Sequence, residues 1–118
     1  MKTSYFHRAK SQALPGVIAI SRSVPFWFGS IPRYPALAPG AWFKSVEQPE
    51  YEQLYAEILE GLEPQQVWND LHDLADPYEP IILCWESLKK PDQFCHRRFA
   101  ADWFTVHLGI DVDEFQLS

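Results

Sequence analysis

The sequence predicts one small α/β domain of three layers, with a mostly parallel sheet and about three helices. Two apolar runs, at residues 16–21 and 80–85, have the character of buried strands, and amphipathic helical patterns lie between and after them. A strand, a helical crossover and a second strand form a right-handed unit in a parallel sheet. A length of 118 residues without an internal repeat fits a single domain, residues 1–118.

Four segments are expected to be strands. Residues 16–21 and 80–85 are continuous and rich in Ile, Val and Leu, as is typical of strands that are covered on both faces. A shorter strand is expected at 3–6. A terminal strand is expected at 112–115, where apolar and acidic residues alternate imperfectly.

Three segments are expected to be helices. The first shows apolar residues at helical spacing on one stripe, namely Tyr51, Leu54, Tyr55, Ile58, Leu59 and Leu62. The second begins at Pro64, which suits a first helical position, and Pro77 ends it. The third is expected to begin near Asp92, whose side chain would cap it, and to stop at Gly109.

Residues 22–44 lack any regular period, because prolines and glycines interrupt them. Long irregular segments of this kind are often functional lids. The segment carries six rings: Phe26, Trp27, Phe28, Tyr34, Trp42 and Phe43. Either these rings anchor the loop on the core, or one or two of them stack on a planar ligand.

Charge and composition limit the possible partners. The net charge is −6, which disfavours a long nucleic acid, because that partner needs a basic surface. Arg97 and Arg98, with Arg22 or Arg33 nearby, leave room for a small anionic molecule, and we expect such a partner. No apolar run approaches the roughly 20 residues that cross a bilayer. The first twenty residues do not resemble a signal peptide, so the cytoplasm is the expected location and the two cysteines are expected to be free thiols.

The candidate site combines the end of one strand with the start of one helix. Cys84 and Trp85 end the strand at 80–85 and Glu86 follows it directly, whereas Cys95, His96 and Arg97 lie in the first turn of the third helix. Ligands of open α/β sheets bind outside the carboxyl ends of the strands, beside helix N-termini. Both segments are therefore expected to face one crevice.

Two arginines at that helix start oppose the helix dipole. Each arginine there destabilises the helix by about a few tenths of a kcal/mol, unless an anion binds between the arginines and the helix start. Arg97 is therefore a candidate ligand for an anion, together with Arg22. The alternative is that Arg98, and with it Arg97, pairs with Glu86 or Asp92.

The remaining site residues have two interpretations each. A helix N-terminus and nearby cations lower the pKa of a thiol, so Cys95 could be a nucleophile or a redox centre, or else a buried inert thiol. Glu86 and His96 could move protons, although Glu86 could equally form a salt bridge. Cys84 and Trp85 are expected to line the site, with packing as the alternative role of Cys84.

A metal site is not predicted, and no cofactor is indicated. Cys84, Cys95 and His96 are three possible ligands, but a closed zinc site needs four, usually at short paired spacings. Adjacent side chains of a helix, such as Cys95 and His96, are also expected to point apart. The sequence lacks a phosphate-binding loop, a dinucleotide-binding glycine motif and a nucleophile-elbow serine.

At these residues the chain resembles the domain-of-unknown-function 488 family. The strand Ile-Ile-Leu-Cys-Trp-Glu, residues 81–86, matches the first motif of that family, with Trp85 where Tyr is usual. Phe-Cys-His-Arg, residues 94–97, matches the second. Weaker similarity covers residues 3–6, 37–39 and 51–62. The resemblance implies a small α/β fold with one site formed by both motifs, and it implies no reaction.

Three functions remain open from the sequence. The leading hypothesis is an enzyme that acts on a small phosphate-bearing or nucleotide-like molecule. In it Arg97 and the helix start hold the anion, Glu86 or His96 moves protons, and Cys95 lines the site or attacks. The alternatives are a binding module without turnover, and a thiol redox protein that uses Cys84 and Cys95.

Overall fold

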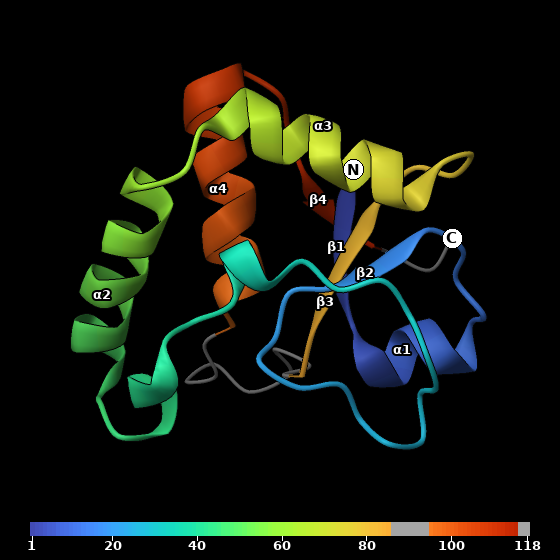
Figure 1. Ribbon diagram of the computed structural model, residues 1–118, viewed down its shortest axis with the longest axis horizontal. Coiled ribbons are helices and arrows are strands. Elements are labelled where there is room, and N and C mark those ends of the chain that lie inside the picture. Colours follow the sequence, from blue (N-terminus) through green and yellow to red (C-terminus); the bar gives the residue numbers. More distant parts are fainter. Residues whose placement is uncertain (86–94, 116–118) are drawn as a thin grey trace.

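A parallel sheet forms the centre of the molecule in the computed structural model, which describes residues 1–85 and 95–115 (Figure 1). The described strands are β1 (Lys2–Tyr5), β2 (Val17–Ala19), β3 (Ile81–Cys84) and β4 (Asp113–Glu114). They lie in the order β2-β3-β1-β4, and every pair is parallel. The predicted α/β class and parallel sheet are confirmed.

The described helices include the three that the sequence predicts and one more. They are α1 (Phe6–Ser11), α2 (Gln48–Glu60), α3 (Pro64–Ala75) and α4 (His96–Leu108), with short 3-10 turns at Pro35–Leu37 and Ala41–Lys44. Pro64 takes the first position of α3, as expected. Gly109 ends α4 in the left-handed conformation, with φ of 67°. Helix α1 replaces the expected end of the first strand, because Phe6 already belongs to the helix.

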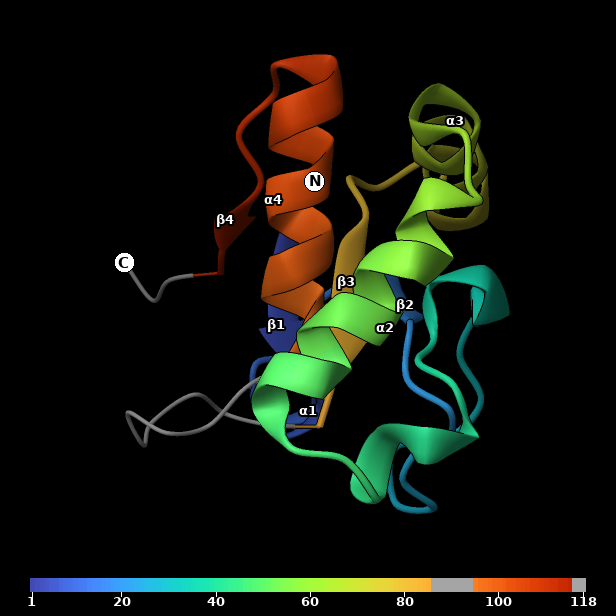
Figure 2. The same ribbon diagram turned by 90° about the vertical axis from the view of Figure 1, so that its left-hand side faces the viewer.

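The sheet is covered on both faces, which gives the three predicted layers. Ile18 and Ile82 pack with α2, α3 and α4 on one face, whereas Ala19 and Leu83 pack with α1 on the other. Figure 1 shows the strands between α2 and α4 on one side and α1 on the other. In Figure 2, α2 and α4 stand in front of the strands.

The start of the last helix differs from the expectation. Helix α4 begins at His96, and Cys95 occupies the N-cap position in an extended conformation. The predicted start near Asp92 is therefore wrong, and Asp92 itself lies outside the described residues. The terminal strand is also shorter than expected, because only Asp113 and Glu114 pair with β1.

Several rings of the 22–44 segment anchor it on the core. Phe28 contacts Phe6 edge-on, with 5.5 Å between ring centroids. The Tyr34 hydroxyl donates a hydrogen bond to Asp70 at 2.7 Å. Phe26 and Trp27 are exposed instead, with 97% and 40% of their surface accessible. In the two described stretches, no helix has both the length and the apolar character needed to cross a membrane.

Candidate functional site

The site lies where the sheet reverses its direction of winding. Strand β1 leads through α1 to β2 at one edge, whereas β3 leads to α4 and then to β4 at the other edge. Strands β1 and β3 are neighbours, and Tyr5 is in register with Cys84 at their carboxyl ends. Such a switch point opens a crevice at the carboxyl ends of the strands. Cys84 therefore stands at the place where α/β proteins bind their ligands.

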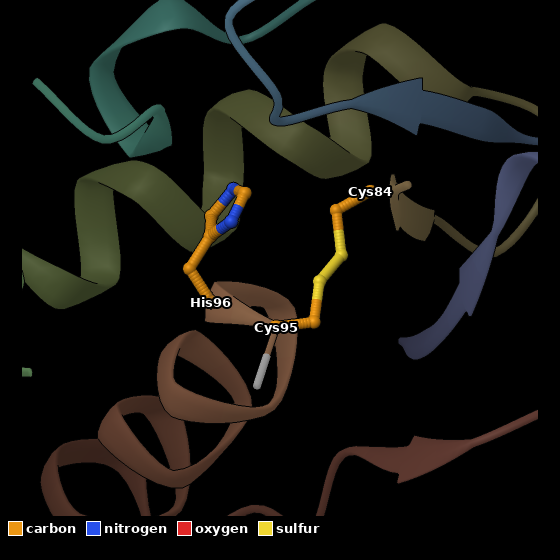
Figure 3. Close-up of side chains that lie close together, drawn as sticks. All are labelled: Cys84, Cys95 and His96. Carbon is orange, nitrogen blue, oxygen red and sulfur yellow. A yellow bond between two sulfur atoms is a disulfide. The ribbon is translucent and has the colours of Figure 1, made fainter. Parts of the chain in front are cut away.

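Cys84 and Cys95 form a disulfide across this point (Figure 3). Their Cα atoms are 6.9 Å apart, and both residues are buried. One sulfur comes from the end of β3 and the other from the N-cap of α4. The expectation of two free thiols is wrong for this form of the chain, and no Cys95 thiolate is present in it.

His96 is buried beside the disulfide. Its Nε2 lies 2.7 Å from the carbonyl oxygen of Ile20, so Nε2 carries the proton and donates, and Nδ1 keeps a lone pair. The ring of Tyr55 meets the imidazole edge-on at 5.3 Å. Burial, and to a lesser degree the nearby charge of Arg97, lowers the pKa of His96 to about 4. The imidazole is therefore neutral near pH 7.

The expectation that Cys95 and His96 point apart is wrong. Their ligand atoms and that of Cys84 all lie within 4.8 Å of one another. Cys95 lies at the N-cap with an extended backbone, outside the helix, so the helical spacing assumed for this pair does not apply to it. Figure 3 shows the His96 ring and the disulfide projecting from the start of α4 to the same side.

A pH-dependent stability follows from the His96 environment. The unfolded chain takes up a proton near pH 6.5, but the folded chain does so only near pH 4. Stability should therefore fall as the pH drops through this window, by roughly 3 kcal/mol in total, and stay unaffected by His96 above it. Urea unfolding of the oxidised protein between pH 7.5 and about 4 should show a smaller fall for His96→Gln. Equal falls in the two proteins would contradict this prediction.

Arg97 and Arg98 find partners that the sequence did not suggest. Arg97 is fully buried and donates two hydrogen bonds to Glu114, at 2.9 and 2.7 Å. A third donor, Nη1, lies 3.1 Å from the sulfur of Cys84. Arg98 donates to Thr3 and to the carbonyl of Val112, at 2.8 and 2.9 Å. Arg97 thus contacts the Cys84 sulfur of the disulfide, and Glu114 balances the positive charge of Arg97.

A pocket of about 300 Å³ opens in front of the disulfide. It is lined by the segments that follow β2 and lead into α2, by the start of α2, by the end of β3 and by the start of α4. The lining residues are Ser21, Arg22, Ser23, Pro39, Phe43, Lys44, Val46, Gln48, Tyr51, Cys84, Trp85 and His96. Arg22 and Lys44 place their cationic groups 5.9 and 5.4 Å from the ring centre of Phe43. Among these described lining residues none is acidic, and Arg22 and Lys44 are cationic.

The structure brings most of the predicted site residues together. Cys84, Trp85, His96 and Arg22 line the pocket, and Cys95 is bonded to Cys84. Arg97 does not line it. Glu86 and Phe94 lie outside the described residues, so their roles stay predictions.

Sequence reasoning missed Lys44 and the partner Glu114. A basic residue next to a ring within the irregular segment was the available signal for Lys44. Glu114 gave no local signal, because it meets Arg97 only after β4 has paired with β1.

Comparison of the chain with protein-family models, curated proteins and solved structures finds no match. The resemblance to the domain-of-unknown-function 488 family therefore stays a prediction.

Proposed function

We propose that Cys84 and Cys95 form a thiol–disulfide redox centre that exchanges electrons with a small thiol in the adjacent pocket. The observation that carries this proposal is the bond between the two sulfurs at the switch point, with Cys84 facing the pocket. Of the three functions considered from the sequence, this one uses the cysteines in the state in which they are found.

The chemistry of exchange fits the surroundings of each sulfur. A small thiolate attacks Cys84, the Cys84–Cys95 bond breaks, and Cys95 leaves as a thiolate at the N-terminus of α4, where partial positive charge stabilises it. A second small thiol then attacks the mixed disulfide at the sulfur that came from the first small thiol. Cys84 leaves as a thiolate 3.1 Å from the guanidinium of Arg97. Two small thiols are oxidised to one small disulfide, and the protein gains two thiols.

A cytoplasmic location is part of this proposal. Disulfides of cytosolic proteins are usually transient and catalytic or redox-sensing rather than structural staples. The alternative is that the disulfide has only a structural role. It would close a loop with a sequence separation of 11 and would stabilise the fold by about 2–4 kcal/mol.

The reduction potential distinguishes the redox centre from a staple. We expect a midpoint potential above about −300 mV, because structural disulfides usually lie below that value. The native protein is equilibrated in mixtures of reduced and oxidised glutathione, and its thiols are trapped by alkylation. Mass spectrometry then measures the fraction of reduced protein. The Cys84→Ser variant serves as control, because it can form a mixed disulfide but cannot complete the exchange.

A disulfide that is reduced only after denaturant is added would contradict the proposal. A midpoint potential below about −300 mV would also contradict the proposal. Either result would assign the bond a structural role.

A second candidate function is the binding of a small phosphate-bearing or nucleotide-like molecule in the same pocket. Arg22 and Lys44 support it, because they supply two cations in a pocket whose described lining lacks carboxylates. Here the neutral imidazole of His96 would accept a proton through Nδ1. The second candidate function also includes the prediction that Glu86 transfers a proton.

Phosphate should then raise the melting temperature above that in chloride of equal ionic strength. The increase should be about 4 °C for each kcal/mol of binding, in both redox states. Arg22→Ala should remove the increase. Arg33→Ala should keep it, because Arg33 belongs to the same irregular segment but does not line the pocket. An equal increase in both variants would contradict this candidate.

A further inference from the structure

Three ligand atoms for a metal ion converge behind the pocket. The sulfurs of Cys84 and Cys95 and a ring nitrogen of His96 lie within 4.8 Å of one another, and all three residues are buried. Around one zinc ion, with bonds of roughly 2.0–2.3 Å, such atoms are about 3.5–4 Å apart. Bonded sulfurs are about 2 Å apart. Once the disulfide is opened, the two sulfurs would therefore have to separate by roughly 1.7 Å, and His96 would have to approach by up to about 1 Å, to seat all three on one ion.

His96 is already oriented as metal-bound histidines are. Its Nε2–H donates to the carbonyl of Ile20, which fixes the ring and leaves the Nδ1 lone pair as the ligand. Metal-ligating histidines almost always donate their second nitrogen to a carbonyl, a carboxylate or water. Arg97 donates to the sulfur of Cys84 at 3.1 Å, in the manner of the outer hydrogen bonds that support metal-bound thiolates.

We propose that the dithiol form of the chain binds one thiophilic metal ion of the zinc class through Cys84, Cys95 and the Nδ1 of His96. Both thiols lose a proton on binding, so two thiolates balance the charge of a divalent ion. The three protein ligands leave one coordination position. Cys84 and His96 both line the pocket, so that position would lie on the pocket side of the buried ligands.

The disulfide and the metal exclude each other. A small disulfide that oxidises the site takes up two electrons from the Cys84 and Cys95 thiolates and leaves as two thiolates, while the bond between Cys84 and Cys95 forms. The ion then loses both sulfur ligands and is released. Metal binding needs the two thiols and His96, but it does not need turnover with a small thiol, so it goes beyond the proposed function.

The test uses zinc as the probe. The full chain is reduced with a phosphine in denaturant, refolded by dilution without oxygen, and titrated with Zn(II) against a chromophoric chelator. Cobalt(II) then reports the ligands, because thiolate coordination gives charge-transfer absorption. We expect one ion per chain for the reduced protein and none for the oxidised protein.

The variants assign the ligands. Cys84→Ser, Cys95→Ser and His96→Ala should each weaken zinc binding at least about 100-fold, more than the loss of an outer hydrogen-bond partner costs. The two serine variants should also reduce the cobalt charge-transfer band. His107→Ala is the matched control, because His107 is an exposed histidine near the other end of α4 and should leave binding unchanged.

Several outcomes would overturn the proposal. They are equal binding to the oxidised protein, no binding to folded reduced protein, and a His96→Ala variant that binds like the parent. A reduced chain that folds only when zinc is added would support it. A reduced chain that stays unfolded with zinc would overturn it.

The midpoint potential is measured separately with a chelator present. A low potential in a protein that binds zinc contradicts only the redox exchange. A high potential in a protein that does not bind zinc contradicts only the metal site.

Discussion

Replacing Arg97 with Ala should destabilise the oxidised protein by about 3–5 kcal/mol. Arg97 has none of its surface exposed, and its partner Glu114 is mostly buried, with 19% of the side chain exposed. The substitution leaves that carboxylate without its bidentate partner. It also removes the cation that lies 5.6 Å from the ring centre of Tyr5. Urea unfolding beside the parent measures the loss.

Two further variants separate charge from packing. Arg97→Met keeps much of the volume and should lose less than Arg97→Ala, because less of a cavity opens. Arg33→Ala removes an exposed arginine and should stay within about 0.5 kcal/mol of the parent. A loss below about 1 kcal/mol for Arg97→Ala would show that the ion pair is not part of the stabilising core.

Replacing Phe104 with Ala should cost about 3–5 kcal/mol, because it opens a cavity in the largest core cluster. Phe104 is fully buried on α4, and its ring meets that of Trp68 on α3 edge-on at 5.4 Å. The substitution therefore weakens the contact between two helices as well as the packing of one side chain. Thermal and urea unfolding both report the change.

Val106→Ala is the matched control on the same helix. Val106 is 78% exposed, so its truncation should change the free energy of unfolding by less than about 0.5 kcal/mol. Similar losses for the two variants would contradict the assignment of Phe104 to the stabilising core, because Ala is a better helix former than either residue that it replaces.

The elements that could be predicted have strong local patterns. The apolar stripe from Tyr51 to Leu62 predicted α2, although the helix itself begins at Gln48. Proline chemistry placed the start of α3 at the observed residue. Helix α1 could not be predicted in this way, because six residues are too short to show a helical period, and only Phe6 and Ala9 in it are buried.

The sequence predicted free thiols for Cys84 and Cys95, whereas the structure joins them in a disulfide. The rule for ligands in α/β sheets placed Cys84 and His96 at one crevice, and they line one pocket. The distance between the two sulfurs could not be predicted, because it depends on where the first residue of α4 meets the end of β3. For the same reason the sequence pointed away from the convergence of Cys95 and His96. Cys95 lies outside α4, at its N-cap, so the helical spacing assumed for the pair did not apply.

The order of the strands affects how the protein folds while it is synthesised on the ribosome. Strand β1 pairs with β3 and β4, and β2 pairs with β3, so the described sheet joins segments that are far apart in the chain. While residues 1–80 are emerging, neither β1 nor β2 has its partner, and both expose unpaired strand edges. The nascent chain therefore carries an aggregation risk until β3 leaves the exit tunnel. Slowing translation before residue 81 should lengthen the period in which a chaperone is needed.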